Sequence, residues 1–205
     1  MLARLRIKGL ERILAGKRTL SVLLSDYTEE MDLFKELFKA GVEFRIKNDG
    51  SEFSLEPLNK YATNVAKIDY LRYKYTINTL RQVVKSGSGY SRKTKMVKWK
   101  ALADVTLADR DKLGYSYPTY PRLYRTGEML KSVVKSGYGH FEHVWRLGFR
   151  IGADNIVASV LNDGNSKIPA RPFFYLSTDL YFYYRKILQL KINSAFRMLR
   201  SVAKY

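Results

Sequence analysis

Two prolines toward the C-terminal end of the chain constrain its fold more than any other feature. Pro169 and Pro172 lie in the run Ile-Pro-Ala-Arg-Pro-Phe-Phe, residues 168–174. Proline fixes φ at about −65°, lacks a backbone donor and pushes the preceding residue out of the helical region. Residues 168–174 must therefore be extended. We expect this segment to deliver Phe173 and Phe174 into a hydrophobic core.

Helical periodicity is the main pattern in the rest of the chain. Apolar residues recur at three- and four-residue spacing over 58–84 and 178–203, so each of these segments predicts a long helix. Shorter helices are predicted over residues 27–40, 104–112 and 127–134, and a short apolar helix or a turn is predicted over residues 156–161. Asp26 suits the N-cap and Gly41 the C-cap of the first of these. The expected packing seam of the last helix is Tyr181, Tyr184, Leu188, Ile192, Ala195, Leu199 and Val202.

Alternation of apolar and polar residues predicts strands in a smaller part of the chain. Residues 145–151 (WRLGFRI) alternate most clearly and form the best predicted strand. Residues 42–47 alternate as well, and Asn-Asp-Gly-Ser at 48–51 predicts a turn after them.

These elements together predict an α+β fold. In it, a small twisted antiparallel sheet is built around residues 130–152 and 168–174 and is packed by the long helix and the C-terminal helix. We divide the chain into a helical N-terminal extension with room for a short strand, residues 1–57, and a domain over residues 58–205.

Positive charge is the strongest compositional signal. Lys and Arg number 37 and Asp and Glu 19, which gives a net charge of +18. Residues 60–100 carry eleven Lys or Arg against the single acid Asp69. This surplus predicts contact with a polyanion or an acidic protein, and solvated helix faces are the alternative. The residues expected to contact DNA backbone or another polyanion are Lys67, Arg72, Lys74, Arg92, Lys93, Lys95, Lys98 and Lys100.

Residue patterns for catalysis or metal binding do not occur. The chain has no cysteine, which excludes disulfides and zinc-thiolate sites, and it has no phosphate-binding glycine loop or nucleophile elbow. His140 and His143 are the only histidines, and on a strand this spacing points them to opposite faces. No run approaches the roughly 18 apolar residues of a membrane span. We expect a non-enzymatic protein that uses no cofactor, no metal and no membrane.

Four pieces of sequence, taken in order, resemble a known family. They are Trp-Lys-Ala-Leu-Ala-Asp-Val-Thr at 99–106, Leu-Tyr-Arg-Thr-Gly-Glu-Met-Leu-Lys-Ser-Val at 123–133, Arg-Ile-Gly at 150–152 followed by Ala158 and Gly164, and Ile-Pro-Ala-Arg-Pro-Phe-Phe at 168–174. Over about residues 99–177 this order resembles the virion-morphogenesis, or tail-completion, family of tailed phages. One position departs from it, because Leu161 stands where the family often has a histidine.

The resemblance implies a structural virion protein of the neck or tail-completion layer, made in the host cytoplasm, that joins or seals the head–tail connection as one subunit of a homo-oligomeric ring. Other neck, connector or tail proteins would be its partners. The residues expected to maintain the motif or an interface are Trp99, Leu102, Thr126, Gly127, Gly164, Pro169, Arg171, Pro172 and Phe173. Thr126 is expected to cap a helix, and Arg171 to pair with a carboxylate within the subunit or across to the next. The alternative function is a basic nucleic-acid-binding module that contacts DNA backbone.

Overall fold

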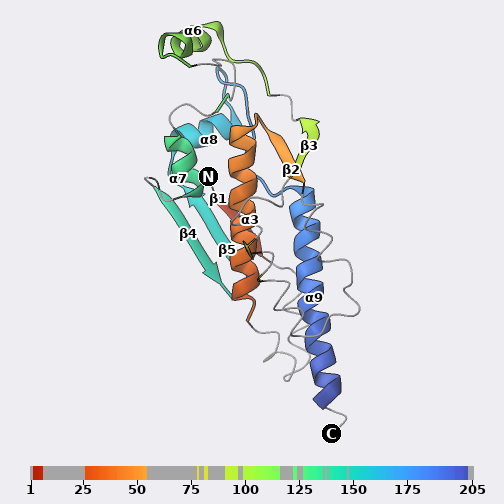
Figure 1. Ribbon diagram of the computed structural model, residues 1–205. Helices are drawn as coiled ribbons and strands as arrows, with labels where there is room; N and C mark the ends of the chain where they lie inside the picture. Colours follow the sequence, from red (N-terminus) through yellow and green to blue (C-terminus); the bar gives the residue numbers. More distant parts are fainter. Residues whose placement is uncertain are drawn as a thin grey trace.

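The structure is a computed structural model that describes residues 2–6, 26–54, 78, 81–82, 91–96, 99–115, 122–123, 127–135, 137, 139–146 and 148–202. The predicted α+β class is confirmed, with antiparallel strands packed against helices (Figure 1). In chain order the elements are β1 (Leu2–Arg6), α3 (Thr28–Lys47), β2 (Ser51–Ser54), β3 (Ser91–Met96), α6 (Asp104–Lys112), α7 (Glu128–Val134), β4 (His140–Trp145), β5 (Gly148–Ala153), α8 (Ile156–Asp163) and α9 (Thr178–Val202).

The larger sheet has the order β1-β5-β4, with both pairs antiparallel, and β2 pairs with β3 in a second sheet. The predicted single strand over residues 145–151 is wrong. A tight turn after Trp145 divides this run between the two strands of a hairpin, β4 and β5. Trp145 pairs with Gly148, so Trp145 and Phe149 lie on opposite faces of the sheet. Residues 168–174 are extended as predicted, but they lie outside the strands of the described sheets.

Helix α3 lies across the sheet and forms the centre of the core. Figure 1 shows it between the β4–β5 hairpin and α9. The predicted end at Gly41 and the predicted strand over residues 42–47 are wrong. The helix continues because Val42 and Ile46, both fully buried, extend the apolar face that begins at Met31. At its start Tyr27 is the N-cap residue, while an Asp26 carboxylate oxygen accepts a hydrogen bond from the Thr28 backbone at 2.9 Å.

Helix α3 contributes to the same hydrophobic core as the C-terminal half of the chain. Phe34 of α3 meets Tyr184 of α9 edge to face at 4.1 Å between ring centroids, and Phe38 meets Phe174 at 5.1 Å. Strand β1 pairs with β5. Apolar side chains of residues 26–54 and of the C-terminal half are therefore buried together in one hydrophobic cluster.

Several helices match their predicted ranges. The predictions for α6, α7, α8 and α9 are confirmed to within a few residues at each end, whereas the predicted helix over residues 58–84 falls almost wholly outside the described residues. In the α9 seam Tyr184 and Leu188 are buried as predicted, but Tyr181 is 44% exposed. Leu180, Tyr183 and Ile187 complete the buried face instead. Among the described residues, none of the helices is both long and apolar enough to cross a membrane.

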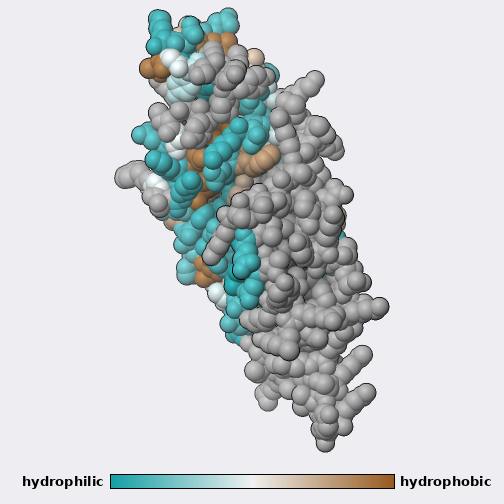
Figure 2. Space-filling model, viewed as in Figure 1, coloured by the Kyte–Doolittle hydropathy of each residue, from teal (hydrophilic) through white to brown (hydrophobic). Residues whose placement is uncertain are grey.

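Hydrophilic residues dominate the described part of the face that Figure 2 shows. Apolar residues gather there in a band over the middle of the body and again on the projecting region of α6. In α6 only Arg110 is buried. This helix therefore contributes no apolar side chain to the core.

Candidate functional site

The extended segment after α8 is fastened to the end of that helix by its backbone. An Asn162 side-chain oxygen accepts hydrogen bonds from the backbone N–H groups of Phe173 and Phe174, both at 3.0 Å. The Arg171 N–H donates to the Leu161 carbonyl at 2.8 Å. Position 161, the one that departs from the family pattern, thus contributes its backbone carbonyl, which any residue at this position would supply. Phe173 is fully buried, as predicted.

Gly164 allows the chain to turn back at the end of α8. Its φ is +75°, and a Cβ there would lie 2.6 Å from the Ala170 backbone nitrogen. Asn165 closes the loop, because its side-chain oxygen accepts from the Lys167 and Ile168 N–H groups at 2.9 and 2.7 Å. The predicted structural role of Gly164 therefore has a steric cause, since only hydrogen fits between the two backbone segments.

Arg45 holds the other side of the same segment. Its side chain is 1% exposed, and one guanidinium nitrogen donates to the Phe173 and Tyr175 carbonyls, both at 3.0 Å. The guanidinium also lies 3.9 Å from the centroid of the Tyr175 ring, whose hydroxyl donates to Glu52 at 2.7 Å. Burial is the main cause that lowers the pKa of Arg45. Sequence reasoning missed this residue because it placed Arg45 on a strand; in the longer helix its position joins the buried face.

Arg171 connects the proline segment to the piece that begins at Trp99. It is 4% exposed, and its guanidinium donates to the Lys100 and Ala101 carbonyls at 3.3 and 3.2 Å. Among the described residues its side-chain hydrogen bonds go to these carbonyls, and none of the carboxylates in that part of the chain accepts a hydrogen bond from it. Burial, then the charges of Arg122 and Arg110, lower the pKa of Arg171.

Asp49 is the acidic member of this neighbourhood, and with Arg110, Arg122 and Arg171 it forms what we name the arginine cluster. The Asp49 carboxylate accepts from the Arg122 backbone N–H, and Arg110 donates to the Arg122 carbonyl at 2.7 Å. Burial raises the pKa of Asp49, and the Arg122 hydrogen bond and the three positive charges oppose that rise. The cluster therefore holds three guanidinium groups around one carboxylate.

Trp99 lies on the turn that carries Asp49. Its indole is 5% exposed, and a Cβ added at Gly50 would lie 2.7 Å from Trp99 Cε2. Trp99 is therefore buried against this turn. It fixes the start of the piece whose next two carbonyls accept from Arg171.

The structure brings together only some of the predicted motif residues. Trp99, Gly164, Arg171 and Phe173 lie along one connected set of contacts, and Pro169 and Pro172 are half-buried within the same segment. Leu102 is half-buried without a described role. Gly127 lies apart from them, at the N-cap of α7, with φ +80°. Thr126 lies outside the described residues.

The predicted polyanion contacts are mostly beyond what the structure describes. Lys67, Arg72, Lys74 and Lys98 are outside the described residues, and Arg92, Lys93 and Lys95 lie on β3, where the backbone alone is described. Lys100 is exposed.

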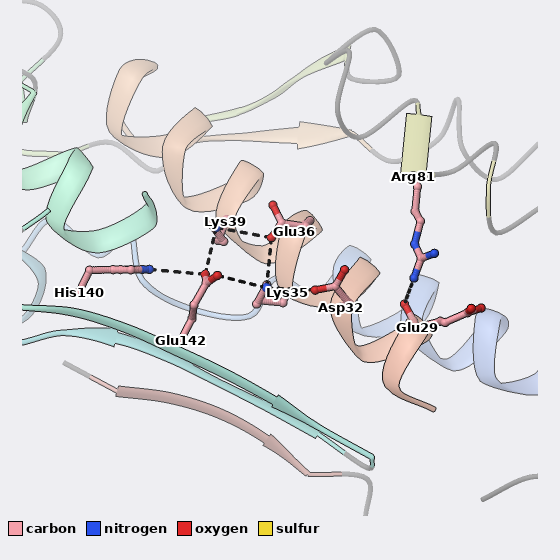
Figure 3. A network of polar contacts seen from close by, with 8 residues as sticks. All are labelled: Glu29, Asp32, Lys35, Glu36, Lys39, Arg81, His140 and Glu142. Carbon is pink, nitrogen blue, oxygen red and sulfur yellow. Dashed lines mark hydrogen bonds and ion pairs between the residues drawn. The ribbon is translucent and has the colours of Figure 1, made fainter. Parts of the chain in front are cut away.

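The two histidines lie on opposite faces of β4, as their spacing predicts. His140 Nδ1 is 3.0 Å from the Ser132 carbonyl oxygen, whereas His143 is exposed and stacks on Trp145. Glu142 between them points to α3 and bonds Lys35 and Lys39 at 3.3 and 3.0 Å (Figure 3). Burial would raise the pKa of Glu142, but the two lysines outweigh it and lower that pKa. Within the described ranges, no group of His, Asp or Glu is placed to hold a metal ion.

Alkaline pH should destabilise the fold through its buried tyrosines. Burial raises the pKa of Tyr175 to about 12, and it also raises the pKa of Tyr27 and Tyr184. An unfolded chain ionises its tyrosines near pH 10. Because the folded state holds these protons more tightly, the stabilisation is complete below pH 10 and falls as the pH rises above 10; the part due to Tyr175 is lost between about pH 10 and 12.

Urea unfolding at stepped pH should show this loss, with tyrosine absorbance near 295 nm reporting ionisation. Tyr175→Phe should reduce the pH dependence, because Phe has no proton to lose. A native protein whose tyrosines all titrate near pH 10 would contradict the prediction.

Comparisons of the chain with models of protein families, with curated proteins and with solved structures found no match. The site stands on its own geometry. A proline-stiffened segment is fixed between Asn162 and Arg45, and beside it lies the arginine cluster, in which Arg110 and Arg171 are buried. Such an arrangement holds Arg171 rigidly, with its side chain buried inside the subunit.

Proposed function

We propose that this chain is a structural protein of the neck or tail-completion layer of a tailed-phage particle, where it joins or seals the head–tail connection as one subunit of a ring. The observation that carries the proposal is the contact between two of the family-like pieces. Arg171 of the proline segment donates to the carbonyls of Lys100 and Ala101, 71 and 70 positions away, in the piece that begins at Trp99. Two family-like pieces that lie far apart in the sequence, residues 99–106 and 168–174, are thus linked by hydrogen bonds in the fold.

The charge of Arg171 supports an interface role. Burial and two neighbouring arginines disfavour its positive charge. Its described side-chain hydrogen bonds go to backbone carbonyls, which a neutral donor could also satisfy. A buried charge is a weak source of stability and is often kept for specificity. In a ring, an acidic side chain from a neighbouring subunit would complement the charge of Arg171, because adjoining subunits of a closed homo-oligomer meet through complementary surfaces.

The proposal is tested on particles of the phage that encodes the chain. Deleting its gene should leave heads and tails unjoined, or tails unstable, and a density map of the intact particle should show the chain in a ring near the portal or tail. Complete particles without density for the chain at that position would overturn the proposal.

Arg171→Met should separate stability from assembly. Two hydrogen bonds to carbonyls of exposed residues are lost, but burial of a charge next to Arg110 and Arg122 is relieved, so the free energy of unfolding should change by about 1 kcal/mol or less. Particle yield should nevertheless fall at least tenfold if the charge is used between subunits.

Arg185→Met, at an exposed position of α9, is the matched control and should leave particle yield unchanged. Urea unfolding and plaque titres provide the two measurements. A normal titre for Arg171→Met would remove the interface role of Arg171.

A basic nucleic-acid-binding module is the second candidate, favoured by the eleven Lys or Arg between residues 60 and 100. In that case the isolated protein binds duplex DNA with an affinity that falls steeply with salt, and particles form without it. Dependence of particle formation on the gene would decide for the first candidate.

A further inference from the structure

One face of the larger sheet carries a row of aromatic rings. We name it the outer sheet face: Phe141, His143 and Trp145 of β4 and Arg150 of β5, on the side of the sheet away from α3. The inner face is defined by Ile151, which is fully buried, and by Glu142, which points to α3 in Figure 3. Successive strand residues point to opposite faces, which places the two sets on opposite sides.

The rings of the outer sheet face are accessible and ordered by mutual contact. Phe141 is 36% exposed, His143 and Arg150 are exposed, and Trp145 is half-buried. His143 stacks on Trp145 with 5.8 Å between centroids and 23° between planes. The Arg150 guanidinium lies 5.1 Å from the Phe141 centroid. Exposed aromatic side chains in a row are costly to leave in water, so their presence points to a ligand.

On β4, β5 and the described residue of the turn between them, the charged side chains outside the inner face are positive. Arg150 is exposed within the face, and Arg146 is exposed in the hairpin turn at its end. The acid of β4, Glu142, is engaged with lysines on the inner side. A second copy of this face would meet it with like charge, whereas a polyanion complements it.

We propose that the outer sheet face binds single-stranded nucleic acid, with bases stacking on Phe141, His143 and Trp145 and phosphates paired by Arg150. Aromatic side chains interleaved with cations are the platform on which unpaired bases stack with little regard to sequence. A duplex hides the faces of its bases, so a single strand is the form that rings on an open sheet can engage. This inference does not depend on the proposed neck function, nor on residues 60–100.

The test uses the full-length protein and a fluorescently labelled oligothymidylate of about 20 nucleotides. Fluorescence anisotropy should show binding that weakens with salt. Stacking should also quench the emission of Trp145, whereas Trp99 is 5% exposed and should be little affected. Heparin, a polyanion without bases, should bind without quenching.

Variants of Phe141 separate ring stacking from hydrophobicity. Phe141→Ala and Phe141→Leu should each weaken oligothymidylate binding about tenfold, because leucine restores apolar volume but no ring, and Phe141→Trp should retain it. Heparin affinity should be unchanged in all three. Phe182→Ala, which removes a 53% exposed ring from α9, is the matched control and should bind as the parent does. Circular dichroism confirms that each variant is folded.

Three outcomes would overturn the proposal. The first is full affinity of Phe141→Leu for oligothymidylate. The second is quenching by heparin equal to that by oligothymidylate, which would reduce the contact to charge alone. The third is a protein that binds no oligothymidylate and whose sedimentation shows dissociation in Phe141→Ala, which would make the face a subunit interface. Particle assembly is measured separately, so failure of this proposal can be distinguished from failure of the proposed neck function.

Discussion

Gly164→Ala should lower the free energy of unfolding by about 4 kcal/mol, which is a large part of the stability of a domain of this size. Two costs combine. A non-glycine residue at φ +75° is strained by about 1–2 kcal/mol, and the added methyl would meet the Ala170 nitrogen at 2.6 Å and the Ile168 carbonyl oxygen at 3.0 Å. Both obstacles are backbone atoms of the proline-stiffened segment, so relief would require displacing the segment that carries Arg171 and Phe173.

Gly114→Ala supplies the matched control. Gly114 has φ +74°, and a Cβ there would meet nothing within 4 Å. It should therefore lose only the conformational part, about 1–2 kcal/mol. Urea unfolding of the two variants gives the difference, which measures the steric cost of the close approach. Equal losses in the two variants would show that the backbone around Ala170 can move away from the added methyl without lowering the free energy of unfolding.

The sequence predicted the helices of this fold well because amphipathic periodicity is a local property. The apolar spacing over α3 and α9 follows directly from burial of one face, and proline spacing alone required residues 168–174 to be extended. Gly41 was misread as a helix end because glycine is common there. It is buried inside α3, where Val42 and Ile46 outweigh its low helical propensity by packing in the core.

The hairpin was missed for a different reason. A run of alternating residues reads the same whether it is one strand or two strands that meet at a tight turn. In this chain Trp145 pairs with Gly148 across the turn. Trp145 therefore lies on the outer sheet face, whereas Phe149 lies in the core on the opposite face. Only strand pairing, which is a tertiary property, distinguishes these cases.

The candidate site was half predictable. Trp99, Gly164, Arg171 and Phe173 carry spacing or backbone signals, whereas Arg45 and Asn162 are polar residues whose partners lie 128 and 11 positions away. Their burial depends on where the proline segment lies, and no local pattern encodes that. A charged residue in phase with an apolar helical face, as Arg45 is in the full length of α3, is the signal that could have found it.

Arg45→Met should lower the free energy of unfolding by about 3 kcal/mol. The methionine keeps apolar volume but leaves the Phe173 and Tyr175 carbonyls without their donor, and a hydrogen bond from a charged group contributes about 1.5–3 kcal/mol. Relief of the buried charge offsets part of the loss of two such bonds. The local loss of stability should be largest in the proline segment, because the Phe173 carbonyl belongs to it and the Tyr175 carbonyl follows it directly.

Arg45→Lys is the discriminating variant. Lysine keeps the charge, but its ammonium cannot reproduce the planar contact with the Tyr175 ring, and its shorter reach must choose between the two carbonyls. If the geometry of the guanidinium is what stabilises the segment, lysine should recover less than half of the loss. If a positive charge near Glu52 were sufficient, lysine would recover most of the lost stability. In that case Tyr175→Phe, which removes the hydroxyl bonded to Glu52 but keeps the ring, would lower the free energy of unfolding as much as Arg45→Met does. Urea unfolding of the three variants therefore decides whether Arg45 acts by shape or by charge, and so whether the segment that carries Arg171 is held rigidly enough to present it to a partner.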